Sequence, residues 1–247
     1  MKRQQGISLS ELLISLLLSS LLMTILMQFY LHNKQQYIVV ENKLDTHFDL
    51  QWITNLLSDS IRRAGFTPCL GIEQLISVDR RSTDNTISAL KINSFPVQSL
   101  QISRMSEEFT ELSSVDHPTQ LFVNEFIELN PKHSVLISDC YHAEVHHIAT
   151  IRKHPHGTLI VLAKPIQFVY PSGAYLGEWL EESWFIKPNF SGSKTLHYQL
   201  RGTEELSAMV HSLATQIVRV NQKKIIKLSL GLADHKTHEL LVAIRAS

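Results

Sequence analysis

The chain has 247 residues, of which 44% are hydrophobic, and its 23 basic and 23 acidic residues balance. This hydrophobic content is sufficient for a folded core and excludes a disordered protein. The charge balance excludes a net field that would attract nucleic acid, anionic lipid or acidic substrates, so charge alone indicates no partner.

The N-terminal region contains an apolar stretch that is long enough to cross a membrane. Leu12 to Leu31 are twenty residues without Asp, Glu, Lys, Arg, Gly or Pro. As a helix they would span about 30 Å, the thickness of the hydrocarbon core of a bilayer. The basic residues Lys2 and Arg3 precede this stretch, whereas acidic residues soon balance Lys34 beyond it. This bias predicts a single membrane span with a cytoplasmic N-terminus and an exported remainder.

Glu11, at the margin of the apolar stretch, limits the interpretations. A secretory signal peptide normally has an apolar region of about 7 to 15 residues and a small-x-small cleavage site, which this sequence lacks. A plain signal anchor gains nothing from a carboxylate, which costs free energy inside a membrane. A buried core helix of a cytoplasmic protein does not fit twenty unbroken apolar residues at a chain terminus.

The segment from Lys2 to Glu11 resembles the type III signal of type IV pilins and pseudopilins. It has a short basic leader that ends in Gly6, then an apolar residue, Ile7, and a glutamate at the fifth position after the glycine. The resemblance implies that a prepilin peptidase cuts after Gly6 on the cytoplasmic face and methylates the new amine of Ile7. The first mature residue of this family is more often phenylalanine, so Ile7 is a departure from the pattern.

The resemblance gives Glu11 a physical role. An ionised carboxylate in an apolar helix bundle costs several kcal/mol unless it is paired. Cleavage creates a cationic α-amine at Ile7, and the amine of an entering subunit can pair with the glutamate of a neighbour. Such a pair would fix the axial register of the helices, so Glu11 is predicted to be an assembly residue.

One long helix is predicted to continue beyond the membrane. No Gly or Pro occurs between Ile7 and Ala64, and beyond Asn33 the apolar residues recur at roughly helical spacing. The predicted buried face consists of Tyr37, Val40, Leu44, Phe48, Trp52, Leu56 and Ile61. Gly65 and Pro68 predict that the helix ends at about Ala64.

The sequence contains two cysteines, Cys69 and Cys140, and no second pair that would indicate a thiolate metal site. From these residues alone, one disulfide or two free thiols are both possible.

Three further stretches resemble the PilW-like family of type IV pilus minor pilins. They are "RRAGFTPC" at residues 62–69, "SDCYHAEVHHIA" at residues 138–149, and the stretch from Trp184 to Val210. The last stretch also resembles the J-type pseudopilin of type II secretion systems, and the cysteine pair favours PilW. In the oxidising periplasm that this resemblance implies, a bridge between Cys69 and Cys140 is expected, with two buried reduced thiols as the alternative.

The resemblance implies an α+β fold of the type IV pilin kind, with a long N-terminal helix packed on an antiparallel β-sheet head. Its expected parts are a leader at residues 1–6, a transmembrane and assembly half of the helix at 7–33, an amphipathic half at 34–64, and a periplasmic β-rich head at 65–247.

Alternating and β-branched runs predict the strands of this head. They are Ser134 to Ser138, Glu144 to Ile151, Thr158 to Ala163, Ile166 to Tyr170, Trp184 to Lys187, Thr195 to Leu200, Gln216 to Asn221, Ile225 to Leu232 and Leu240 to Arg245. Short connections between them favour antiparallel pairing. The polar segment from Ile72 to Glu128 contains strand-like pieces at Ser88 to Ile92 and Gln98 to Ser103, and we expect it to consist otherwise of irregular loops.

Histidines gather between residues 142 and 156. On a strand His142 and His146 would share a face while His147 points away, and the sequence supplies no identifiable third zinc ligand. We therefore expect no metal, and the absence of catalytic motifs predicts neither an enzyme nor a cofactor.

The sequence predicts a minor pilin that takes part in the assembly or initiation of a type IV pilus. It would reside in the bacterial inner membrane and, after assembly, at the pilus tip. The expected partners are other minor pilins, the major pilin and the prepilin peptidase. The sequence firmly implies no nucleic acid, and it predicts no small-molecule substrate. The alternatives are a J-type pseudopilin of a type II secretion system and a signal-anchored periplasmic enzyme or binding protein.

Overall fold

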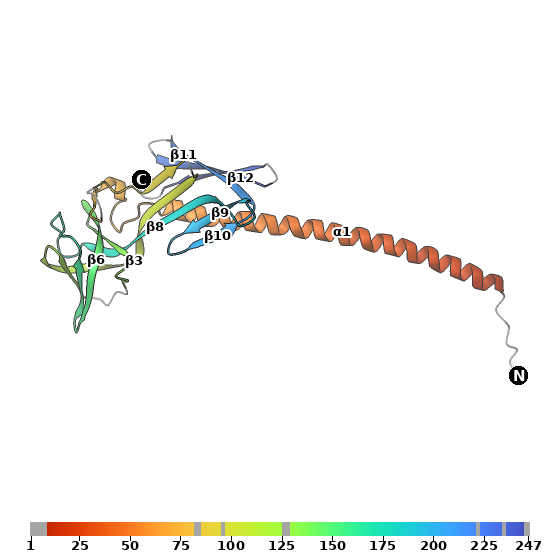
Figure 1. Ribbon diagram of the computed structural model, residues 1–247, viewed down its shortest axis with the longest axis horizontal. Helices are drawn as coiled ribbons and strands as arrows, with labels where there is room; N and C mark the ends of the chain where they lie inside the picture. The colour runs from red at the N-terminus through yellow and green to blue at the C-terminus, as the bar shows by residue number, and fades with distance from the viewer. Residues whose placement is uncertain are drawn as a thin grey trace. The chain divides into compact units, whose positions relative to one another are not determined.

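The computed structural model describes residues 9–81, 85–94, 97–124, 129–220, 223–233 and 236–244. The chain divides into two compact units, Met1–Trp52 and Ile53–Ser247. Helix α1 (Leu9–Arg62) is continuous and provides the described part of the first unit and the first residues of the second (Figure 1). The architecture is α+β and type IV pilin-like, one long N-terminal helix followed by a large antiparallel β-sheet head.

Helix α1 ends two residues before the predicted end at about Ala64. A turn follows Arg62, in which the Ala64 N–H donates to the Ile61 carbonyl at 3.1 Å. Gly65 then has a positive φ of 69°, which is the backbone conformation that favours glycine just after a helix. A Cβ at Gly65 would also lie only 2.8 Å from the Ala89 Cβ, so both conformation and space require glycine there.

The buried face of α1 differs from the predicted one. Side chains of the predicted face from Tyr37 to Trp52 are all at least 50% exposed. Burial begins at Ile53, and Ile53, Leu57 and Ile61 are fully buried. The prediction was therefore wrong for the turns before Ile53, because helical spacing reveals an apolar stripe but not where along the helix the chain covers that stripe.

The described elements after α1 are η1 (Ile72–Gln74), β1 (Ile76–Asp79), β2 (Leu90–Asn93), β3 (Ser99–His117), β4 (Gln120–Val123), β5 (Ser134–Ser138), β6 (His142–His154), β7 (Gly157–Leu162), β8 (Tyr175–Pro188), β9 (Lys194–Gln199), β10 (Thr203–Ser207), β11 (Val210–Val220), β12 (Lys223–Leu232) and β13 (Thr237–Ala243). Their pairings are antiparallel, except that β1 pairs with β6 in parallel.

Sequence patterns predicted all or part of β5 to β9 and of β11 to β13, missed β10, and misjudged two regions. The segment from Ile72 to Glu128 holds β1 to β4 instead of mainly irregular loops, and β3 alone has 19 residues. Its polar residues gave little local signal, because its partner β8 lies far away in the chain. The predicted strand from Ile166 to Tyr170 is a loop, because the N–H groups of Gln167 and Phe168 donate to the Glu144 carboxylate instead of to a neighbouring strand.

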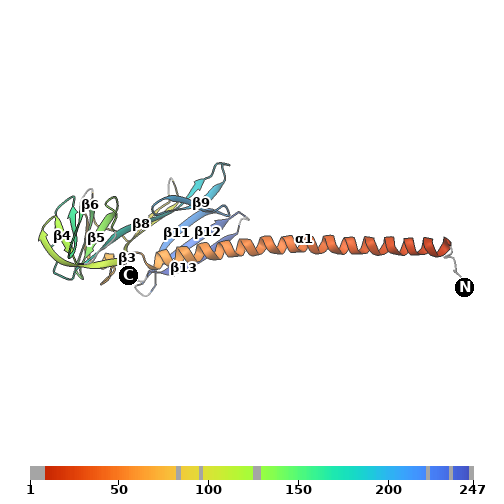
Figure 2. The same cartoon turned by 90° about the horizontal axis from the view of Figure 1, so that it is seen from below.

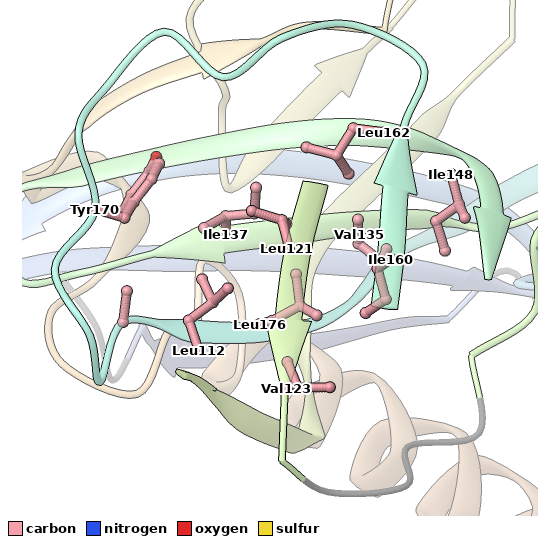
Figure 3. Close-up of a cluster of buried hydrophobic side chains, with 11 residues drawn as sticks. Leu112, Leu121, Val123, Val135, Ile137, Ile148, Ile160, Leu162, Tyr170 and Leu176 are labelled. Atoms are coloured by element: carbon pink, nitrogen blue, oxygen red, sulfur yellow. The ribbon is translucent and has the colours of Figure 1, made fainter. Parts of the chain in front are cut away.

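Ten of the described strands form one sheet, and part of this sheet closes on itself. Strands β3, β4, β7, β6, β5 and β8 pair in this order, and β8 pairs again with β3 through Thr110 and Leu176. We call this group the strand ring, and Figure 2 shows its labelled members curving around one end of the second unit. Its interior holds an apolar cluster that includes Leu121, Val135, Ile160 and Leu176, whose side chains point toward one another in Figure 3.

The second unit also contains a three-stranded sheet in the order β11-β12-β13. In Figures 1 and 2 the last turns of α1 lie alongside β11 and β12. Alternate residues Ile226, Leu228 and Leu230 of β12 are fully buried, whereas the residues between them are partly exposed. One face of this sheet therefore contributes to the core and the other faces outward.

Glu144 is a buried carboxylate that holds the loop between β7 and β8. Its oxygens accept the Gln167 N–H at 2.9 Å and the Phe168 N–H at 2.7 Å, and its Oε2 lies 3.0 Å from Nε2 of the buried His146. Burial acts to raise the pKa of the Glu144 carboxyl, but the contact with His146 and the two N–H donors outweigh burial and hold this pKa below its ordinary value. Burial also raises the pKa of nearby Tyr170, and the Glu144 charge adds to that rise.

We predict that Glu144→Gln lowers the free energy of unfolding by about 3 kcal/mol at neutral pH, because an amide cannot accept from all these donors. A carboxyl whose pKa is lowered by folding stabilises the fold above its unfolded pKa and loses that effect as pH falls through the folded pKa. The stability of the unmodified protein should therefore decrease below about pH 4.5, the ordinary pKa, and the variant should show a smaller decrease. Denaturant unfolding monitored at several pH values checks this, and an unchanged acid dependence would contradict it.

Candidate functional site

The part of α1 from Leu12 to Leu31 presents an almost uniformly apolar surface. The large apolar side chains between Leu12 and Leu31 are 45% to 71% exposed. By length and composition, α1 could cross a membrane, and it is the one such helix in the part of the chain that the structure describes. An exposed apolar surface of this extent requires a lipid or protein environment.

Hydroxyl groups within this surface are satisfied inside the helix. Ser15 Oγ donates to the Leu12 carbonyl at 2.9 Å, and Ser19, Ser20 and Thr24 donate to carbonyls three or four residues earlier in the same way. These bonds spare the four hydroxyls the cost of being unpaired in an apolar environment. Glu11 is the one acidic or basic side chain in the segment from Leu9 to Leu31.

Glu11 is exposed and lies in the first turn of the described helix. A carboxylate is favoured there, because the partial positive charge of the helix N-terminus stabilises an anion. The predicted processing residues Gly6 and Ile7 lie outside the described residues. In the sequence, Ile7 precedes Glu11 by four residues.

The residues after α1 attach it to β3. The Gly65 N–H donates to the Ser103 carbonyl at 2.8 Å, and the Met105 N–H donates to the Phe66 carbonyl at 3.0 Å. Arg63 forms ion pairs with Asp59 and Glu107. The hydrogen bond that the Arg63 guanidinium donates to the Asp59 carboxylate outweighs partial burial and raises the pKa of Arg63. The "RRAGF" segment is thus a hydrogen-bonded turn that joins the end of α1 to β3, and its glycine has a steric reason to be there.

Cys69 and Cys140 are joined by a disulfide in the structure, with their Cα atoms 5.3 Å apart across a separation of 71 residues. Both cysteines are exposed. Next to them the Ile76 N–H donates to the Tyr141 carbonyl at 2.9 Å, where β1 begins its parallel pairing with β6. The bridge therefore connects the chain just after the helix to the start of β6.

The histidine-rich segment does not form a metal centre in the described residues, where no group of three or more His, Cys, Asp or Glu side chains could hold a metal ion. His146 is buried and His147 is exposed, as strand alternation predicts. His142 instead stacks on Phe168, with ring centroids 4.4 Å apart. Sequence reasoning missed Glu144, the partner of His146, although a lone acid among apolar residues in a predicted strand was a usable signal.

Comparison with known families gives a match to the N-terminal part of the chain. A family model described as the prokaryotic N-terminal methylation motif matches residues 1–27. No curated protein and no solved structure matches the chain. The matched motif, together with the apolar helix, supports a type IV pilin or pseudopilin-like subunit that is anchored in a membrane and has a structural role.

We predict that the Cys69–Cys140 bridge is present in the native protein. Titration of denatured, unreduced protein should detect no reactive thiol. The double variant Cys69→Ser, Cys140→Ser should lose roughly 4 kcal/mol of stability, because the bridge closes a long loop in the unfolded chain. Two reactive thiols in the denatured, unreduced protein would contradict the bridge.

Proposed function

We propose that this protein is a PilW-like minor pilin that takes part in the assembly or initiation of a type IV pilus. The observation that carries the proposal is Glu11, a carboxylate in the first turn of an exposed apolar helix and within the matched methylation motif. The resemblance of residues 62–69 and 138–149 to PilW-like proteins supports the finer assignment.

The proposed maturation begins with removal of residues 1–6 by a prepilin peptidase. The new amine of Ile7 would lie one helical turn from Glu11 of the same chain, and in a helix bundle it could instead meet Glu11 of a neighbouring subunit. Because both charges are costly in an apolar environment and are neutralised together, the correct axial register is the one of lowest free energy. The pair would thereby select where each subunit stops as it enters the bundle.

The other parts of the chain have corresponding proposed roles. Residues 7–33 would hold the subunit in the inner membrane and later in the bundle, residues 34–64 would continue the helix, and residues 65–247 would form the periplasmic head. The proposed orientation follows from the basic leader, which favours the cytoplasm. Partners would be other minor pilins and the major pilin.

A J-type pseudopilin of a type II secretion system is the second candidate. It is favoured by the resemblance of the stretch from Trp184 to Val210, which forms parts of β8 to β11. Deleting the gene separates the two functions: loss of surface pili with normal enzyme secretion supports the minor pilin, and the reverse result supports the pseudopilin.

We predict that Glu11→Val leaves membrane insertion intact and reduces the amount of this chain in sheared pili at least about tenfold, because the entering amine loses its partner. Immunoblots of membranes and of sheared pili measure both quantities.

Ser15→Val is the matched control, since it also makes the helix more apolar but removes a hydroxyl that bonds only within its own helix. It should enter pili normally. Wild-type levels of the Glu11→Val chain in pili, or equal loss of both variants, would refute the role of Glu11.

A further inference from the structure

Strand β13 ends the three-stranded sheet. It pairs with β12 in unbroken register from Thr237, opposite Gly231, to Ala243, opposite Ile225. Among the described residues no other strand pairs with β13. Its side away from β12, which we call the β13 edge, is therefore a row of backbone groups that pair with no other described strand.

The register identifies which groups form the β13 edge. The Leu232 N–H donates to the Lys236 carbonyl at 2.8 Å, and the Ile244 N–H donates to the Lys224 carbonyl at 3.3 Å. Hydrogen-bonded and non-hydrogen-bonded pairs alternate in an antiparallel ladder, so the even-numbered residues of β13 face β12. The N–H and C=O groups that point away from β12 are those of Thr237, Glu239, Leu241 and Ala243.

The β13 edge lacks the features that usually protect a sheet edge. Proteins shorten edge strands, bend them with bulges, or place proline or lysine on them. Strand β2 has four residues and β10 has an irregularity between Glu205 and Ser207. Strand β13 has seven residues, contains no Pro, Lys or Arg, and has a regular register, and its Leu241 is 68% exposed.

We propose that the β13 edge binds an extended segment of another pilin-like subunit, which adds to the sheet as a further strand. This inference rests on the proposed function for the identity of the partner. Only an extended backbone presents donors and acceptors at the two-residue spacing of Thr237, Glu239, Leu241 and Ala243.

The side chains specify the partner strand further. Glu239 already has a cationic partner, because Lys227 Nζ lies 2.8 Å from its carboxylate. The exposed Leu241 and Ala243 then leave an edge that is nearly neutral and apolar at one end. The partner segment should therefore be neutral, with an apolar or β-branched residue opposite Leu241.

A second copy of β13 fits less well than a different strand. Two β13 edges can join in one antiparallel sheet only about a two-fold axis perpendicular to that sheet. This axis would reverse the last turns of α1, which lie alongside β11 and β12 (Figure 2). The α1 helices of the two chains would then approach the joined sheet from opposite directions. The helices of subunits that are anchored in one membrane approach from the same side.

Leu241→Pro tests the proposal in full-length protein in cells. The Leu241 N–H does not face β12, so proline removes an outward donor and is compatible with an edge position. Leu241→Ala is the matched control, since it shortens the side chain and keeps the N–H. The proline variant should enter pili at least about tenfold less than wild type, and the alanine variant less than about threefold less.

Photo-crosslinking identifies the occupant independently of how the variants fold. A benzophenone side chain at position 241 should form an adduct with a subunit that has its own N-terminal methylation motif. The same probe at Gln216, which is exposed on β11 in the same row of the sheet, should give at least fivefold less of that adduct. No adduct, an adduct with a second copy of this chain, or one with a protein that is not pilin-like would overturn the proposal.

The two proposals can fail separately. If Glu11→Val blocks entry into pili while Leu241→Pro behaves like Leu241→Ala, the β13 proposal is wrong and the proposed function stands. If Glu11→Val enters pili normally, the proposed function is wrong, whatever the result at β13.

Discussion

A carboxylate at the edge of an apolar helix needs a cation, and the proposed assembly of this subunit depends on that pairing. Glu11 lies in the first turn of α1, beside a surface that only lipid or other apolar helices could cover. The helix N-terminus stabilises such a charge in part, but a buried ion also requires a close partner. Proteolysis at the preceding glycine would supply that partner in every subunit, so the same step that matures the chain would prepare it for assembly.

The second unit is held together by strand pairing and by specific contacts outside the strands. Its strand ring is closed, because β3 and β8 pair with each other from Ser99 to Glu111 and each also pairs with another strand of the ring. Gly65, the disulfide and the Glu144 carboxylate each fix a connection outside the strands: the helix exit, the start of β6 and the loop before β8. Irregular segments are thereby held by specific contacts, and β13 remains as a regular strand with an open side.

The sequence predicted the features that depend on local pattern. The helix, the role of Gly65 after it and most strands from Ser134 onward could be read from spacing and turn residues, because these signals lie within one element. The long strand β3 and the exposed stripe before Ile53 could not, since pairing with β8 and coverage by other segments are properties of the tertiary fold. The loop held by Glu144 was mistaken for a strand for the same reason: its hydrogen-bond acceptor lies 23 residues away in the chain.

Pairing between Glu11 and a cleaved N-terminus requires a free amine at Ile7. Mass spectrometry of the N-terminal peptide from membrane-extracted protein should find a chain that begins at Ile7 and has one added methyl group on its amine. A native chain that still begins at Met1 would contradict the account, because no amine would then be present at Ile7 to pair with Glu11.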